Sequence, residues 1–194
     1  MHINKILFKI SIGVALLVAP FFYAWTIKST AATVRINGAQ GDYYNLLVDG
    51  FLEGHLYMKA KVDPQLLAMA PEQRPGGAPY LLDASLYKGN YYLYFGVTPA
   101  ICLFLPFHLI TNHDLPEAVG CFIFILIGYF IAAAWWWRLF RKFFPNLSTL
   151  WYMLGVLAIG FCTAAPSALR RPLFYETTIA AGFAAIMFLL WAFQ

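Results

Sequence analysis

Charged side chains are scarce in this sequence. Only 11% of its 194 residues are charged, whereas 61% are hydrophobic and 19% are aromatic. A soluble domain carries about a quarter charged residues, so this composition excludes an ordinary soluble domain and indicates a membrane protein. The net charge of +4 is therefore no sign of nucleic-acid binding, and we read the Lys and Arg residues as markers of membrane topology.

Recognisable metal, redox and repeat patterns are also lacking. The three Cys residues lie in apolar runs at spacings that fit no zinc or redox motif, and the four His residues form no cluster. We therefore expect no cofactor and no metal, with a divalent ion left open. His108 lies in an apolar run where it could face a cavity, but a structural role is favoured. The Cys residues are Cys102, Cys121 and Cys162.

The first apolar run, residues 10–27, follows Lys5 and Lys9 and precedes Lys28. It could be a cleaved signal peptide. Its length, Pro20 and its bulky aromatic residues favour an uncleaved anchor instead. In either case the two preceding lysines predict a cytoplasmic N-terminus and place the following segment outside.

A polar segment, residues 28–92, follows the anchor and holds six of the nine acidic residues. A connection of this length usually carries function, so we expect an extracytoplasmic loop with a role of its own. Further apolar runs cover residues 93–111, 118–138, 147–169 and 174–194. Because the last run is still apolar where the sequence stops, we expect the chain to be the N-terminal portion of a longer membrane domain, or a truncated protein.

Basic residues decide between two topologies. If every apolar run crosses the bilayer, Arg138, Arg141 and Lys142 fall outside, against the positive-inside rule. If residues 93–111 do not cross, the same basic group becomes cytoplasmic. This doubtful run contains Gly96, Pro99 and Pro106, and prolines interrupt helical hydrogen bonding. We prefer a re-entrant or juxtamembrane segment there, and an all-α polytopic fold with about four transmembrane helices.

Residues 42–53 predict an amphipathic helix just outside the membrane. At roughly 100° per residue, Asp42, Asp49 and Glu53 fall within about 40° of one another, and Tyr, Leu, Val and Phe side chains fill the opposite half. We expect this helix to lie along the membrane surface. Two interpretations remain for its acids. Asp42 caps the helix while the other two are solvated, or a carboxylate serves as a general base in a wet cleft.

The order of motifs resembles that of the GT-C class of polytopic glycosyltransferases, which includes protein mannosyltransferase and aminoarabinose transferase relatives. An anchor is followed by DYYNLLVDGFLEGHL, a Pro-rich stretch, LLDASLYKGNYYLYFGVTPAICLFLPFHLI, a span, and RRPLFYE at the start of another span. The resemblance covers nearly the whole chain through short, degenerate motifs whose order and spacing carry it.

The resemblance implies transfer of a sugar from a polyprenyl-phosphate donor on the extracytoplasmic side. It implies that Asp42 is the base, and it matches Arg170, Arg171 and Glu176 to a second outer loop. Many relatives have a second acid next to the first. Tyr43 occupies that position here, which puts a metal role in doubt. Asp49, Tyr43 and Asp83 complete the candidate site as supporting residues.

The chemistry favours the same residue types. A departing lipid phosphate is well held by arginine, whose planar guanidinium binds phosphate oxygens bidentately, and a base removes the proton of the acceptor. A single displacement predicts inversion. Structural alternatives remain. Arg170 and Arg171 could snorkel to lipid headgroups, and Asp83 could be a turn residue. Glu176, close to an apolar run, needs a partner, and we expect one of these arginines.

We therefore expect an enzyme, a membrane glycosyltransferase whose acceptor is a lipid, a polysaccharide or a protein, although activity of so short a chain alone is an open question. The expected location is the bacterial inner membrane, with several crossings. Alternatives are a non-catalytic or truncated protein of the same fold, or a transporter or flippase of envelope glycolipids. A transporter would be expected to show inverted repeats and paired charges at the bilayer midplane, and the sequence shows neither.

Overall fold

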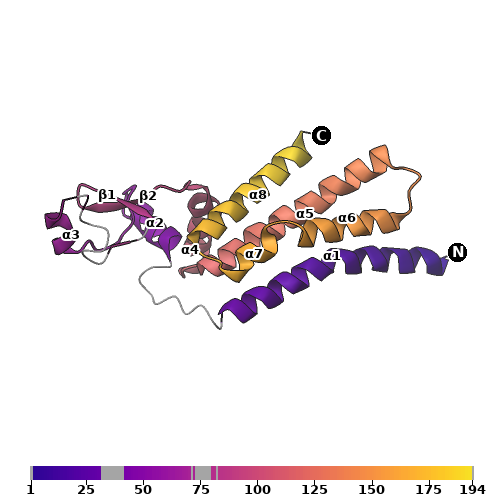
Figure 1. The fold of residues 1–194 in the computed structure, drawn as a ribbon, viewed down its shortest axis with the longest axis horizontal. Helices are drawn as coiled ribbons and strands as arrows, with labels where there is room; N and C mark the ends of the chain where they lie inside the picture. The colour runs from indigo at the N-terminus through magenta and orange to yellow at the C-terminus, as the bar shows by residue number, and fades with distance from the viewer. Residues whose placement is uncertain (1, 32–41, 71, 73–79, 82, 194) are drawn as a thin grey trace. The chain divides into compact units, whose positions relative to one another are not determined.

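The computed structural model describes residues 2–31, 42–70, 72, 80–81 and 83–193, and it is mostly helical. The chain divides into two compact units, whose relative positions are not determined (Figure 1). Unit 1 comprises Met1–Arg35 and Cys121–Gln194, and unit 2 comprises Ile36–Gly120. Each unit is therefore described by itself.

Unit 1 is built from apolar helices (Figure 1). Three of its helices are long and apolar enough to cross a membrane, over Ile10–Ser29, Glu117–Phe143 and Phe174–Ala192, which indicates an integral membrane protein. The helices are α1 (His2–Ala31), α5 (Glu117–Phe143, whose first turn belongs to unit 2), α6 (Thr149–Phe161), α7 (Ala165–Arg170) and α8 (Phe174–Ala192).

Unit 2 combines short helices with a β-hairpin, so the chain is mostly helical, as predicted, but not purely α. Strands β1 and β2 pair antiparallel, with Tyr87 opposite Asn90. Between them Lys88 and Gly89 have φ values of 48° and 79°, as a two-residue type I′ turn requires. The elements are α2 (Tyr43–Leu52), α3 (Pro64–Ala68), β1 (Ala84–Tyr87), β2 (Asn90–Leu93), η2 (Ala100–Phe104) and α4 (Leu105–Thr111).

The expected span over residues 147–169 is broken, which corrects the count of four long spans. Helix α6 has 13 residues and ends at Phe161, and α7 begins at Ala165. Pro166 explains the break, because a continuous helix would place its ring against the carbonyl group of Cys162 and would lack the hydrogen bond between them. The consequence is a separate short helix, α7, which carries Arg170 in its last turn.

Residues 93–111 contain only a short helix. The five-residue π-helical turn η2 continues into the seven-residue α4, and at 1.5 Å per residue the two extend about 18 Å, well short of a bilayer core. In unit 1, α1 and α5 run in opposite directions (Figure 1). Both observations agree with a segment that does not cross, and the sidedness of the protein stays a prediction.

Helices α1 and α6 approach closely at small residues. Gly160 lies so near α1 that an added Cβ atom would fall 2.5 Å from the Cβ atom of Ala19. The buried Tyr23 hydroxyl donates a hydrogen bond to the carbonyl oxygen of Gly160, and the Tyr129 hydroxyl donates to the carbonyl oxygen of Leu16 at 3.2 Å. Small residues at a helix crossing allow such contacts where the surrounding lipid offers no hydrophobic driving force.

Replacing Gly160 by alanine tests this contact. Gly160→Ala should destabilise the protein by about 1–3 kcal/mol, because the added methyl group overpacks the α1–α6 crossing. The matched control is Gly13→Ala, since nothing lies within 4 Å of the position of its Cβ atom. Apparent unfolding midpoints in detergent, followed by circular dichroism, should fall for the first variant only. Equal midpoints for the two variants would refute the close approach.

Candidate site around the start of helix α2

Helix α2 has the predicted amphipathic pattern, but protein covers its apolar face. Tyr43, Tyr44, Leu47 and Val48 are buried, and Asp42 is exposed. The Tyr44 ring lies 5.2 Å from the ring of Phe104 in η2. The acid-bearing face is therefore confirmed. A position flat on the membrane surface is not supported for this helix, because its apolar residues pack inside unit 2.

Glu117 caps α2 in place of Asp42. Glu117 is only 3% exposed, and its Oε1 accepts a hydrogen bond from the backbone N–H of Tyr44 at 3.2 Å. A side-chain oxygen that accepts from a first-turn N–H satisfies part of a helix N-terminus. Asp42 occupies the N-cap position, but its side chain makes no capping hydrogen bond. The interpretation of Asp42 as the capping side chain is therefore wrong.

The Asp42 carboxyl group is electrostatically perturbed. Its pKa is raised from the ordinary 3.8, first by desolvation and second by the negative charge of Asp114. The residue as a whole is exposed, so water reaches this carboxylate while nearby protein atoms remove part of its hydration. A raised pKa makes a carboxylate a stronger base.

Asp114 and His108 form a polar pair near α4. The Nδ1 atom of His108 lies 3.2 Å from Oδ1 of Asp114, and the Asp114 side chain is 64% exposed. His108 therefore faces a carboxylate at the end of its apolar run, which agrees with the structural role favoured for it.

The three supporting residues of unit 2 differ in their surroundings. Tyr43 is buried, and burial, with Asp83 as the next cause, raises the pKa of Tyr43 to about 12. Asp83 has a φ of 56° and accepts a hydrogen bond from the Tyr94 hydroxyl at 3.3 Å, which favours the turn interpretation. Asp49 is half-buried on α2.

Arg170, the first of the two candidate arginines, lines a cleft. The cleft lies between the last turns of α1 and helix α7 within unit 1 and has a volume of about 690 Å³. Arg170 is one of the lining residues, and Arg171 follows α7 as its C-cap. Both arginines are exposed. Among the described residues, the lining consists of Phe22, Trp25, Thr26, Ser29, Pro166, Ser167 and Arg170.

Glu176 does not pair with an arginine, so that expectation is wrong. Its Oε2 accepts a hydrogen bond from the backbone N–H of Leu173 at 3.2 Å, which closes the N-terminus of α8. Local capping satisfies this carboxylate because it lies in the first turn of the helix, within reach of the backbone N–H of the N-cap residue. Among the described residues, the ion pairs are Lys59–Glu53 and His108–Asp114.

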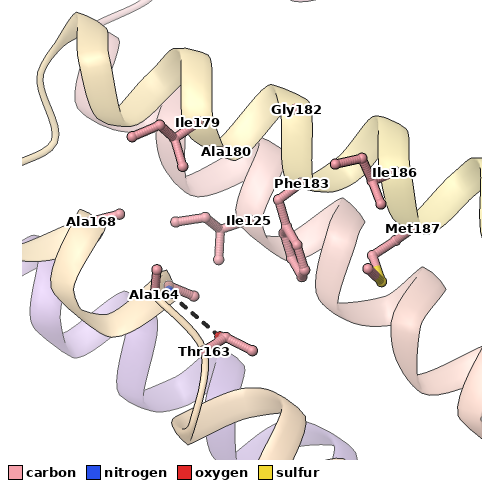
Figure 2. Close-up of a pocket in the computed structure, with 11 residues that line it drawn as sticks. Ile125, Thr163, Ala164, Ala168, Ile179, Ala180, Gly182, Phe183, Ile186 and Met187 are labelled. Atoms are coloured by element: carbon pink, nitrogen blue, oxygen red, sulfur yellow. Dashed lines mark hydrogen bonds between the residues drawn. The ribbon is translucent and has the colours of Figure 1, made fainter.

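The opposite face of α7 borders an apolar cavity of about 370 Å³. Figure 2 shows Ile125 of α5, Ala168 of α7 and Ile179 of α8 around this space. Its lining carries no charged side chain, and Thr163 is its one polar residue. It can hold hydrocarbon but offers no group for acid–base chemistry.

The candidate residues thus fall into two groups. Asp42, Asp49, Tyr43 and Asp83 belong to unit 2, while the arginines and Glu176 belong to unit 1, and a shared pocket stays a prediction. The buried capping residue Glu117 was missed by sequence reasoning. The one feature of the sequence that could have indicated Glu117 is its position as a single acidic residue at the start of an apolar run. In the described parts of the chain, no three His, Cys, Asp or Glu residues are grouped so as to hold a metal.

Comparisons with known proteins leave the family open. No protein-family model, curated protein or solved structure matches this chain.

Removing the carboxylate that caps α2 should loosen this helix. Glu117→Ala leaves the buried N–H of Tyr44 without its acceptor, which typically costs about 1–3 kcal/mol. Hydrogen–deuterium exchange of the peptide covering α2 should accelerate at least tenfold. The matched control is Glu53→Ala, which breaks an exposed ion pair with Lys59 and should cost less than about 1 kcal/mol. Unchanged exchange in the first variant would contradict the capping role.

The raised pKa of Asp42 predicts a pH-dependent stability. Because ionisation is harder in the folded protein than in the unfolded chain, stability is lost as the pH rises from 3.8 through the folded-state pKa. Asp42→Asn removes this loss. The variant should unfold at a higher temperature than the wild type at pH 7, and at the same temperature below pH 3.8. A difference that does not change with pH would speak against the shift.

Proposed function

We propose that this protein is an integral membrane glycosyltransferase of the GT-C type that uses a polyprenyl-phosphate-linked sugar donor. The observation that carries the proposal is the state of Asp42. Asp42 occupies the N-cap position of α2, but Glu117 accepts the capping hydrogen bond in its place. The Asp42 residue is exposed, and its carboxyl group has a raised pKa. A water-accessible carboxylate without a structural duty is suited to accept a proton from an incoming hydroxyl group.

In the proposed reaction, an acceptor hydroxyl oxygen attacks the anomeric carbon of the donor. The bond from that carbon to the phosphate oxygen breaks, the phosphate leaves with the electron pair, and Asp42 takes the hydroxyl proton. The anomeric configuration is inverted, because a single displacement forms no covalent enzyme intermediate. Arg170, which lines the cleft of unit 1, supplies positive charge for the leaving phosphate, and one well-placed donor of this kind is worth about 2.7–4 kcal/mol.

The remaining features of the proposal concern partners and location. The donor and the acceptor, which is a lipid, a polysaccharide or a protein, meet on the extracytoplasmic side of the bacterial inner membrane. Tyr43, Asp49 and Asp83 shape the surroundings of the base in unit 2, and Glu176 fixes the start of α8. The apolar helices and the exposed aromatic residues Tyr87 and Tyr94 support placement at a lipid–water boundary.

Replacing Asp42 by asparagine should reduce sugar transfer by about 10²–10⁴-fold, the usual contribution of a general base. The assay uses the full-length protein in proteoliposomes with a radiolabelled polyprenyl-phosphate hexose and envelope lipids as acceptors. Glu53→Gln, on the exposed side of the same segment, should retain activity.

Each outcome of this assay decides one point. Turnover by Asp42→Asn at the wild-type rate would remove Asp42 from the mechanism. If the wild type transfers no sugar from any polyprenyl-phosphate hexose tested, the transferase proposal fails, and a non-catalytic membrane protein or a transporter becomes the better description.

A further inference from the structure

The cleft between α1 and α7 is bordered by a positive charge. Arg170 is the charged residue among its described lining residues, and no ion pair involving Arg170 is found in the part of the chain that the structure describes. An arginine that borders a cleft of about 690 Å³ attracts an anionic ligand, and its planar guanidinium is matched to phosphate or carboxylate.

Three residues that line the cleft carry hydroxyl groups, and of these Thr26 is buried while Ser29 and Ser167 are exposed. The hydroxyls of Thr26, Ser29 and Ser167 each donate their proton to a backbone carbonyl oxygen, those of Phe22, Thr26 and Ala164 respectively, at 2.8 Å. Their lone pairs therefore remain for a ligand that donates hydrogen bonds. A bare phosphate offers them only the acidic protons that it retains near neutral pH, whereas a phosphate ester that carries hydroxyl groups offers further donors.

The rest of the cleft favours a ligand with a hydrocarbon part. Trp25 is 60% exposed, and its ring lies 5.8 Å from that of Phe22. Both residues belong to the last turns of the candidate span Ile10–Ser29, at the end where membrane-spanning helices place aromatic side chains. Polar groups and aromatic walls therefore meet where the head and the chains of a lipid would join.

We propose that this cleft binds the phosphate group of a membrane lipid whose head also carries hydroxyl groups, with Arg170 as its positive partner. The hydroxyl oxygens of Thr26, Ser29 and Ser167 accept hydrogen bonds from the head, and Arg171 takes no part in the cleft. Phosphatidylglycerol and a polyprenyl-phosphate hexose share this chemistry. Only if the lipid is the hexose donor does the inference rest on the proposed function.

Binding, rather than turnover, tests the site. The full-length protein in detergent is titrated with phosphatidylglycerol and analysed by native mass spectrometry. Arg170→Gln should weaken binding at least tenfold, Arg171→Gln should change it less than twofold, and Arg170→Lys should retain part of it. Phosphatidic acid, which has the phosphate but no head hydroxyl groups, should bind more weakly than phosphatidylglycerol.

A second variant guards against misfolding. Ser167→Val removes one acceptor oxygen while keeping Arg170, and it should reduce the preference for phosphatidylglycerol over phosphatidic acid. Size-exclusion profiles and unfolding midpoints identify variants that fail to fold. Equal losses in Arg170→Gln and Arg171→Gln, or equal binding of phosphatidylcholine and phosphatidylglycerol, would overturn the proposal.

A second titration, with a polyprenyl-phosphate hexose, separates this proposal from the proposed function. Arg170-dependent binding of phosphatidylglycerol without binding of the hexose would assign the cleft to a resident lipid and count against the transferase. Arg170-dependent binding of the hexose would support both the cleft and its use by a donor. Failure of both lipids would overturn the cleft alone, since sugar transfer is measured separately.

Discussion

The missing backbone N–H of Pro166 is the constraint on which much of unit 1 depends. A helix that continued from α6 through this position would carry its side chains in one unbroken register. Because the proline ends that register, the chain bends after Phe161 and restarts as α7. The bend places Ser167 and Arg170 in the lining of the cleft beside α1. Pro166 therefore accounts both for the short helix α7 and for one side of the polar cleft.

The capping of α2 from a distant residue has a comparable effect in unit 2. A helix that begins with an aspartate normally uses this side chain to satisfy its first N–H groups. Here a carboxylate 73 positions away satisfies the N–H of Tyr44, and burial makes that contact strong enough to matter. Asp42 is thereby separated from the structural role that its position suggests. Glu117 is buried and stabilises the fold, whereas Asp42 is exposed to water.

The sequence predicted features that depend on local periodicity. Most of the apolar spans, the amphipathic helix over residues 42–53 (Tyr43–Leu52 in the structure) and the interruption of residues 93–111 by prolines were predicted because spacing and proline positions act within a few turns. The hairpin was missed, although Lys88 and Gly89 have the positive φ values of a type I′ turn, because its residues were assigned to the long polar loop. The Glu117 cap and the difference between Arg170 and Arg171 depend on contacts between distant segments, which no local pattern specifies. Glu176 shows the opposite error, because a long-range ion pair was expected where a backbone N–H three residues away suffices.

Helix α7 lies between the apolar cavity and the polar cleft of unit 1. Ala164, Ala165 and Ala168 border the apolar cavity, and Pro166, Ser167 and Arg170 border the polar cleft. A displacement of these few residues that widened one space would narrow the other. Such a displacement would couple the binding of hydrocarbon in the cavity to the binding of an anion in the cleft. Thermodynamic linkage would make that coupling reciprocal. Hydrocarbon in the cavity would change the affinity of the cleft for an anion by the same factor as the anion would change the affinity of the cavity for hydrocarbon.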